Sequence, residues 1–167
     1  MSITGVRVGQ GFDIHRFSDD PKRPLVLGGV TFEGVRGLEG HSDADAIAHA
    51  CADALLGAAG LGDIGQHFPD TDPQWKGVDS LKLLDHVAML VRAQGWVIGN
   101  IDCSVVCEQP KLAPRRDEMQ QKLSAVAGAP VSVKGRRAEG LGALGRQEGI
   151  ACWAVAVIFQ VENRSEV

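Results

Sequence analysis

Residues 8–17, VGQGFDIHRF, carry the most informative pattern in the chain, because Asp13 and His15 are separated by one residue. In a β-strand, residues i and i+2 point to one face and lie about 6 to 7 Å apart, so these two side chains can bind one ion. Residues 41–57, HSDADAIAHACADALLG, are expected to form a helix that carries His49. A histidine from a helix packed on that face supplies a third ligand. The sequence therefore predicts a strand and a helix in contact around a metal site.

The expected ligands are typical of a catalytic metal centre. Two imidazoles and one carboxylate with the fourth position open indicate catalytic rather than structural zinc. Asp45 and Asp53 lie four residues before and after His49, and one of them is expected to bind its second ring nitrogen and fix its tautomer. A solvated helix face with incidental histidines would contain the same residues, so this alternative stays open.

Composition limits the class of protein. The chain has 167 residues, 44% of them hydrophobic, and a net charge of −4, which predicts one domain (residues 1–167) and argues against nucleic acid as the main partner. Neither a signal peptide nor the roughly 18 unbroken apolar residues of a membrane span is present, so we expect a cytoplasmic protein without a membrane partner. The four cysteines form no CxxC pair. Reduced core thiols are favoured over disulfides or a zinc finger.

The remaining elements follow from apolar periodicity and from helix-end signals. Ser42, with Asp45 three residues later, is expected to cap the helix that ends near Ala59. Pro114 is expected to start another helix that ends near Gly128. The other predicted elements are a strand over 6–13, an apolar hairpin over 25–32, a helix over 80–94, and strands over 97–107, 131–134 and 152–161.

The last of these strands is apolar on both faces. One face carries Trp153, Val155, Val157 and Phe159, and the other carries Cys152, Ala154, Ala156 and Ile158. Three amphipathic helices cannot easily cover both faces of such a sheet. We therefore expect an α+β fold with helices packed on one face of the sheet and another subunit of a homo-oligomer on the other.

Several polar segments could bind phosphate or a polar substrate. His41 and Ser42 stand at the predicted helix start, where backbone N–H groups attract anions. Residues 63–72 are suited to binding hydroxyl groups, and Lys111 lies between two prolines. The glycine-rich residues 133–149 could wrap a diphosphate, with Glu139 binding a hard cation. In each case an ordinary cap or surface loop would look the same.

Five segments occur together in one known family: GFDIHRF (11–17), HSDADAIAHACADALLGAAGLGDIG (41–65), FPDTDPQWKG (68–77), EQPKLAP (108–114) and GRQEGIAC (145–152). The chain resembles the 2-C-methyl-D-erythritol 2,4-cyclodiphosphate synthases of non-mevalonate isoprenoid biosynthesis. The resemblance implies a homotrimer whose sheets face the threefold axis, with an active site at each subunit boundary. It also implies a phosphorus–oxygen lyase that closes 4-diphosphocytidyl-2-C-methyl-D-erythritol 2-phosphate into the cyclic diphosphate and releases CMP.

The resemblance also assigns site residues. It implies Zn²⁺ on Asp13, His15 and His49, a second divalent ion (Mg²⁺ or Mn²⁺) on Glu139, and His41 beside the reacting phosphates. The implied contacts to the methylerythritol part are Ser42, Asp63, Gly65, Phe68, Pro69, Asp70, Thr71 and Asp72. Further implied substrate contacts are Asp13, Ile14, His15, His41 and Ile64. The cytidine pocket, supplied by the neighbouring subunit, is implied at Cys107, Glu108, Gln109, Pro110, Lys111, Leu112 and Ala113 and at the backbone near Arg136. Arg137, Ala138, Glu139, Ala143 and Arg146 are also implied as substrate contacts.

Two positions depart from the family pattern. Arg137 stands where a threonine usually contacts the transferring phosphate, so its side chain either replaces that catalytic contact or turns outward. Ala143 stands where an aromatic residue often closes a cavity on the trimer axis, whose other residues match Phe12 and Arg146. These departures leave open an isoprenoid diphosphate ligand in that cavity. They also leave two alternatives for function, a zinc-dependent phosphohydrolase and a non-catalytic trimeric binding protein.

Overall fold

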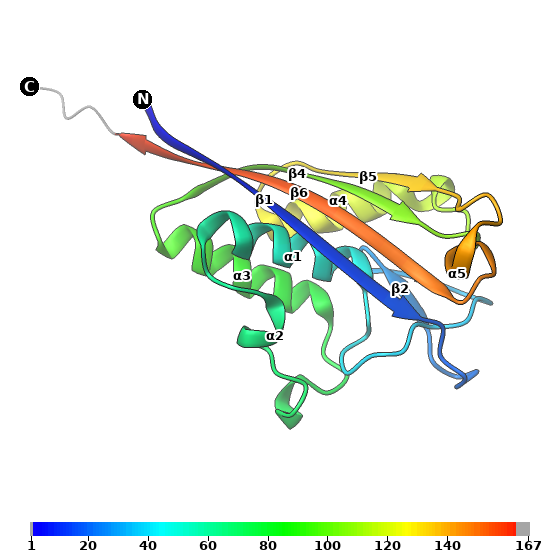
Figure 1. Ribbon diagram of the computed structural model, residues 1–167. Helices are drawn as coiled ribbons and strands as arrows, with labels where there is room; N and C mark the ends of the chain where they lie inside the picture. Colours follow the sequence, from blue (N-terminus) through cyan, green and yellow to red (C-terminus); the bar gives the residue numbers. More distant parts are fainter. Residues whose placement is uncertain (1, 163–167) are drawn as a thin grey trace, which may run out of the picture.

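The computed structural model describes residues 2–162, which form one four-stranded sheet, a separate hairpin and a layer of helices (Figure 1). The strands of the sheet lie in the order β1-β6-β4-β5; β6 pairs antiparallel with both β1 and β4, and β4 pairs parallel with β5. The elements are β1 (Ser2–Arg16), β2 (Leu25–Leu27), β3 (Val30–Phe32), α1 (Ala46–Ala59), α2 (Ile64–His67), α3 (Ser80–Ala93), β4 (Val97–Val106), α4 (Arg116–Ala127), β5 (Val131–Arg136), α5 (Gly142–Gly145) and β6 (Gly149–Glu162). Short 3₁₀ turns cover Pro73–Trp75 and Ala113–Arg115.

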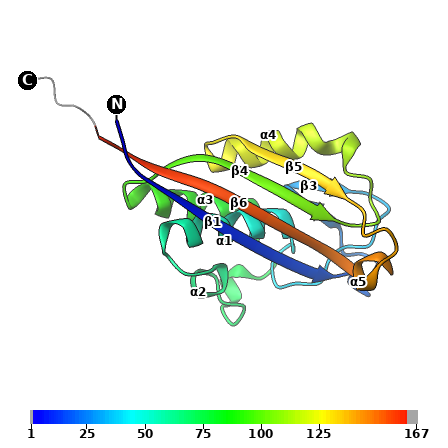
Figure 2. The same ribbon diagram turned by 45° about the horizontal axis from the view of Figure 1, so that its top comes forward.

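The long helices cover one face of the sheet, which confirms the predicted mixed α+β architecture (Figure 2). Helix α1 packs directly on β1 and β6, and α3 packs on α1. In the core between these layers α1 contributes mainly alanine residues, and α3 contributes mainly larger aliphatic residues. Small side chains on α1 allow the helix to approach the sheet closely, and this approach positions the site.

Two glycines of β1 fix how closely α1 lies. A Cβ atom on Gly9 would lie 2.0 Å from the carbonyl oxygen of Ala54, and one on Gly11 would lie 2.0 Å from that of Ala50. Because strand residues alternate between faces, Asp13 and His15 lie on the same face as these glycines. The helix backbone therefore contacts the strand at Gly11, two residues before Asp13, and does so through Ala50, the residue after His49.

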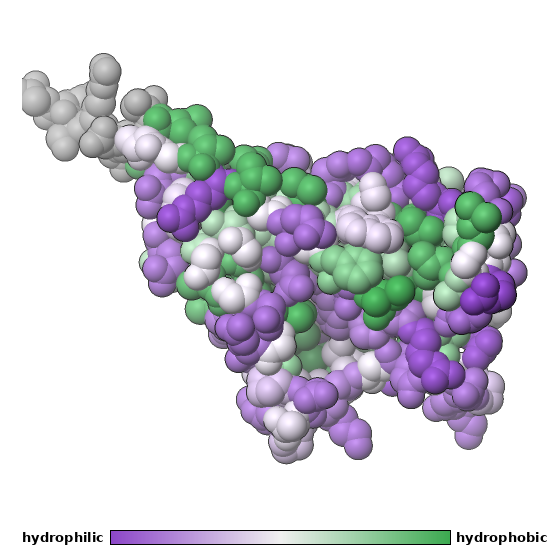
Figure 3. Space-filling model, viewed as in Figure 1, coloured by the Kyte–Doolittle hydropathy of each residue, from purple (hydrophilic) through white to green (hydrophobic). Residues whose placement is uncertain are grey.

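The opposite face of β1 and β6 is apolar and exposed. Val8 is 66% exposed and Trp153 is 41% exposed, and the Phe12 and Trp153 rings stack with their centroids 4.9 Å apart. Figure 3 shows hydrophobic surface along the projecting ends of β1 and β6. The predicted split of the last strand is confirmed, since Cys152, Ala154, Ala156 and Ile158 are all buried.

The predicted start of helix α1 is wrong. Its N-cap is Asp45, whose side chain accepts hydrogen bonds from the N–H groups of Ile47 and Ala48. Ala44 has φ +59°, in the left-handed region, so the helix cannot extend back to Ser42. The free helix N–H groups expected beside His41 and Ser42 are consequently occupied by Asp45.

Other boundaries shift by a few residues. The helix expected from Pro114 begins at Arg116, because Ala113–Arg115 form a 3₁₀ turn, and it ends as predicted at Gly128 in the left-handed conformation. Strands β1 and β6 extend beyond their predicted ends. The four cysteines are free and buried, as predicted. Among the described residues, no helix combines the length and hydrophobicity that a membrane crossing requires.

Candidate metal centre and adjoining cavities

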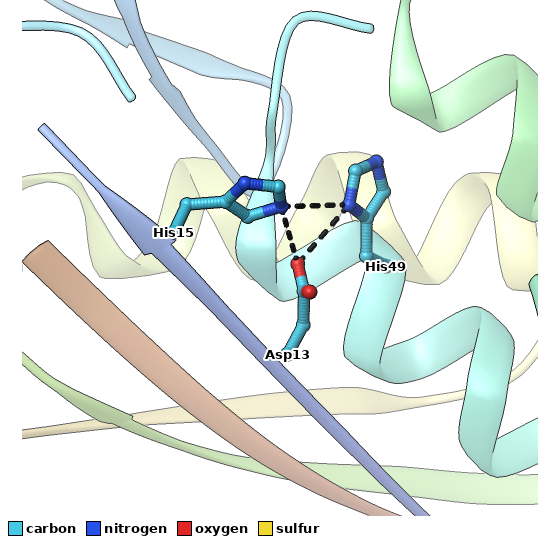
Figure 4. A group of neighbouring side chains, drawn as sticks. All are labelled: Asp13, His15 and His49. Carbon is cyan, nitrogen blue, oxygen red and sulfur yellow. Dashed lines mark hydrogen bonds and ion pairs between the residues drawn. The ribbon is translucent and has the colours of Figure 1, made fainter. Parts of the chain in front are cut away.

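Asp13 and His15 on β1 and His49 on α1 converge at one point (Figure 4). Asp13 Oδ2 lies 2.9 Å from His15 Nε2 and 3.1 Å from His49 Nδ1, and the two ring nitrogens are 3.3 Å apart. Three ligands that each lie about 2.0 to 2.1 Å from a tetrahedral zinc ion are roughly 3.3 Å apart. The predicted convergence is confirmed, and the donor set fits a divalent metal.

The negative charge of Asp13 and a positive charge on His15 stabilise each other. Burial opposes ionisation of Asp13, but hydrogen bonds from His15 and His49 prevail and lower the pKa of its carboxyl group to about 2. Burial likewise opposes a charge on His15, and its hydrogen bond and attraction to Asp13 prevail and raise the pKa of its imidazole above 6.5. A cation is therefore favourable between these side chains, whether it is a proton or a metal ion.

A backbone carbonyl orients the His15 ring. Its Nδ1 lies 2.7 Å from the carbonyl oxygen of Glu39, so Nδ1 carries the hydrogen and donates it. In the protonated ring Nε2–H donates to Asp13, and in the neutral ring the lone pair of Nε2 points toward Asp13 and His49. This is the usual arrangement of a metal-binding histidine, in which one nitrogen binds the metal and the other donates to an oxygen.

The second nitrogen of His49 has a different partner from the one predicted. Its Nε2 lies 2.8 Å from Ser80 Oγ and 3.1 Å from Ser42 Oγ. Asp45 is fully buried at the helix cap, and Asp53 accepts a hydrogen bond from the backbone N–H of Ile64. The prediction that one of these carboxylates binds His49 is therefore wrong, because both are used to anchor the backbone.

A cavity of about 220 Å³ opens beside the three ligands. Among the residues predicted to bind substrate, His41, Ser42, Ile64, Gly65 and Phe68 line it. Trp75 and Leu83 complete the lining and were not predicted as site residues. The tryptophan belongs to the FPDTDPQWKG segment, a signal that could have identified it, whereas Leu83 follows a helix pattern that indicates only core packing.

The acidic residues of the 63–72 segment mainly cap short helices. Asp63 caps α2, a helix that sequence analysis missed, and Asp72 caps the turn at Pro73–Trp75. The backbone carbonyl of Asp72 lies 3.3 Å from His41 Nε2. Pro69, Asp70 and Thr71 follow α2 and are not among the residues that line the 220 Å³ cavity. Ile14 points to the opposite face of β1 and is exposed.

A second cavity, of about 180 Å³, lies where β4 and β5 end. Its lining contains most of the predicted cytidine residues and Arg137, together with Arg116 and Gly135, which were not predicted. The full lining is Cys107, Glu108, Pro110, Lys111, Leu112, Ala113, Arg116, Gly135, Arg136 and Arg137. The Arg137 side chain lies 4.0 Å from Glu108 in an ion pair, so it has turned toward this cavity.

Other predicted site residues lie apart from the three ligands. Gln109 and Arg146 line a further cavity beside Phe17, and Arg146 also pairs with Glu148. Ala138, Glu139 and Ala143 belong to the connection between β5 and β6 and line neither the 220 Å³ nor the 180 Å³ cavity. Within residues 2–162 of one chain, the structure therefore does not bring Glu139 to the metal centre.

Comparisons with known proteins agree with this arrangement. A model described as the YgbB family matches residues 6–159. A 2-C-methyl-D-erythritol 2,4-cyclodiphosphate synthase of Synechococcus elongatus is 53% identical over 157 residues, 92% of this chain and 97% of that protein. A bifunctional enzyme IspD/IspF of Anaeromyxobacter dehalogenans is 54% identical over 158 residues, and the match spans 93% of this chain but only 40% of that relative.

Solved structures show the same fold. The bifunctional IspDF of Campylobacter jejuni superimposes with a TM-score of 0.90 at 38% identity, covering 96% of this chain and 44% of that one. IspF of Plasmodium falciparum, in a complex with CDP, superimposes with a TM-score of 0.82 at 33% identity, covering 96% and 100% of the two chains. The similarity therefore extends over nearly the whole length of this chain.

Proposed function

Since the chain belongs to the YgbB family of 2-C-methyl-D-erythritol 2,4-cyclodiphosphate synthases, we propose that it converts 4-diphosphocytidyl-2-C-methyl-D-erythritol 2-phosphate into the cyclic diphosphate and CMP. The reaction makes it a phosphorus–oxygen lyase of isoprenoid precursor biosynthesis, and residues 1–167 serve as one catalytic domain. The observation that carries the proposal is the cluster of Asp13, His15 and His49 at the wall of the 220 Å³ cavity.

The proposed reaction is an intramolecular phosphoryl transfer. An oxygen of the 2-phosphate attacks the β-phosphorus, and the bond from that phosphorus to the oxygen shared with the α-phosphate breaks. The electron pair leaves with CMP, so no protein nucleophile is needed. What the protein must supply is alignment of two anionic groups and relief of their repulsion.

Each part of the site has a role in this proposal. A zinc ion on Asp13, His15 and His49 would hold and polarise a phosphate oxygen, and a second ion, Mg²⁺ or Mn²⁺, on Glu139 would neutralise the diphosphate. His41 and Ser42 face the same cavity and would hold the phosphates and hydroxyl groups in line. Ile64 and Phe68 would exclude water from the methylerythritol part.

The separation of the two cavities supports a homotrimer with its active sites at subunit boundaries. The metal ligands and the Lys111 pocket are distinct cavities of one chain, and the apolar outer face of β1 and β6 is exposed. In the proposed trimer these faces meet at the axis, and a neighbour's Lys111 pocket receives the cytidine. Phe12 and Arg146 would line an axial cavity for an isoprenoid diphosphate.

The test is CMP release from the proposed substrate with zinc and magnesium present, repeated after chelation. We expect His15→Ala and Asp13→Asn to lower kcat/KM at least about 100-fold while the chain stays folded. Asp85→Asn, which changes the same charge on an exposed part of α3, is the matched control. Phosphate analysis separates the alternatives, because a hydrolase gives an uncyclised product and a binding protein releases no CMP. Full activity in a zinc-free, folded variant would refute the proposal.

A further inference from the structure

The imidazole of His49 is linked through one serine to the partly buried carboxylate of Asp43. Ser80 Oγ lies 2.8 Å from His49 Nε2 and donates a hydrogen bond to Asp43 Oδ1. Ser80 is fully buried at the first turn of α3, and sequence analysis did not identify it. The helix cap of α3 is Asp79, so the hydroxyl of Ser80 is not needed to cap the helix.

The hydrogens in this chain can be assigned from the chemistry of the groups. An ionised carboxylate only accepts hydrogen bonds, so the single hydroxyl hydrogen of Ser80 must point to Asp43. The oxygen of Ser80 is then an acceptor toward His49, and His49 Nε2 must carry the ring hydrogen. In the neutral imidazole, Nδ1 consequently keeps a free lone pair. That nitrogen is the one 3.1 Å from Asp13 Oδ2.

Asp43 itself is held rigidly by the backbone. Its Oδ2 accepts from the N–H of Ser80, and its Oδ1 accepts from the N–H of Asp45. Ser42 Oγ lies 3.2 Å from Ser80 Oγ and accepts from the N–H of Ala44. Since the Ser80 hydrogen is used by Asp43, Ser42 is the donor in its contact with Ser80, and its oxygen is left to accept from the Nε2–H of His49, 3.1 Å away. The contacts of Ser80 therefore agree: its hydroxyl donates to Asp43 and accepts from Ser42 and His49.

We propose that Asp43 and Ser80 are positioning residues that hold His49 as the Nε2–H tautomer, with Nδ1 directed at the metal. This inference rests on the metal centre of the proposed function. It adds α3 to the parts that build the centre, because Ser80 at the start of that helix contacts the second ring nitrogen of His49. His15 obtains the same control from the carbonyl of Glu39.

Zinc affinity tests the proposal without any turnover. The dissociation constant for Zn²⁺ is measured by competition with a chromophoric chelator for the wild-type chain and for Ser80→Ala. We expect a 10- to 100-fold weaker affinity in the variant, the usual cost of losing a partner of a metal-binding histidine. Ser132→Ala is the matched control, because Ser132 also donates to an aspartate, Asp102, but lies on the edge strand β5. Its affinity should stay within twofold of wild type.

The tautomer of His49 is a second readout that a merely structural role would not change. Nitrogen-15 shifts of the ring are recorded at pH 9 on metal-free Asp13→Ala, which removes the carboxylate 3.1 Å from Nδ1. They should show hydrogen on Nε2 in that variant and a mixture when Ser80→Ala is added. A hydrogen on Nδ1 in Asp13→Ala with Ser80 intact would overturn the proposal even if the Ser80→Ala variant failed to fold. So would an unchanged zinc affinity in folded Ser80→Ala.

The two proposals fail in different ways. If the wild-type chain binds no zinc, the proposed metal function fails, while the tautomer of metal-free His49 still tests the role of Ser80. If the wild type binds zinc and releases CMP but Ser80→Ala has the same affinity and the same tautomer, only the positioning role fails. A lower melting temperature with both readouts unchanged would reduce Ser80 to a packing residue.

Discussion

The two faces of strand β1 contrast sharply, although they belong to the same fifteen residues. The inner face carries Gly9, Gly11, Asp13 and His15, each in contact with α1 or with the metal centre. The outer face carries Val6, Val8, Phe12 and Ile14, all exposed in one chain. The inner face is completed by the chain itself, whereas the outer face is an apolar surface of the kind that subunits cover.

This contrast separates folding from assembly. At the inner face there is no room for a Cβ atom on Gly9 or Gly11, because the backbone of α1 lies against the strand there. The outer face has no such fixed partner within residues 2–162. Substitutions on the inner face should therefore act on the stability of one subunit and on its metal ligands, and those on the outer face should act on association.

The largest effect is expected at the inner face from Gly11→Ala. The new Cβ would lie 2.0 Å from the carbonyl oxygen of Ala50, which is helix backbone and cannot turn aside. Separation of α1 from β1 should lower the free energy of unfolding by more than about 3 kcal/mol, measured by urea titration. Gly5→Ala on the same strand is the control, because its nearest contact would be an ordinary 3.5 Å. Equal stability of the two variants would contradict the close-packing argument.

The next effect is expected at the outer face from Val8→Glu. A carboxylate inside an apolar subunit interface loses hydration without gaining a partner, so the proposed trimer should dissociate at least about 100-fold more readily. Sedimentation measures the change in mass, and circular dichroism checks that the subunit stays folded. Gln121→Glu adds the same charge on exposed α4 and should leave the mass unchanged. If Val8→Glu remains a trimer, β1 does not lie in the subunit interface.

The sequence predicted the parts of this contrast that depend on local spacing. The i, i+2 pair of Asp13 and His15 and the two-faced last strand follow from strand alternation, and both are confirmed. The exact cap of α1 was missed because two candidate residues, Ser42 and Asp45, precede the helix. The left-handed Ala44 that decides between them leaves no signal in composition.

The long-range parts of the site could not be predicted. Ser80 is 31 residues from His49, and nothing in its local pattern shows that α3 begins beside the metal centre. By spacing alone, Asp45 and Asp53, each four residues from His49, were the expected partners of its ring. They are taken by backbone N–H groups, which become neighbours only when the β2–β3 hairpin and α2 pack against α1.

A smaller effect on the inner face is expected from Asp45→Asn. The buried carboxylate accepts from the N–H groups of Gly28 and Gly29 on the hairpin and also caps α1. Asparagine keeps one acceptor oxygen but turns an N–H₂ group against a backbone donor, at a cost of about 1 to 3 kcal/mol in unfolding free energy. Asp79→Asn, at a cap of α3 that accepts one hydrogen bond and that asparagine can still make, should cost less. Equal costs in urea titration would show that the hairpin contacts contribute nothing.

The smallest effect on stability is expected from the protonation of His15. Its pH dependence differs between the metal-free and the metal-bound protein. Because Asp13 raises the pKa of His15 in the folded state, the folded metal-free chain keeps a proton that the unfolded chain has lost. This contribution to stability is present in full below pH 6.5 and disappears as the pH rises through the folded pKa. Zinc binding has the opposite slope over the same range, since it requires the neutral ring. The free energies of unfolding of the metal-free wild type and of His15→Gln, measured by urea titration, should therefore converge as the pH rises from 6 to 9. The zinc affinity of the wild type should increase over the same range. If the two stability curves stay parallel, His15 and Asp13 are not paired in solution.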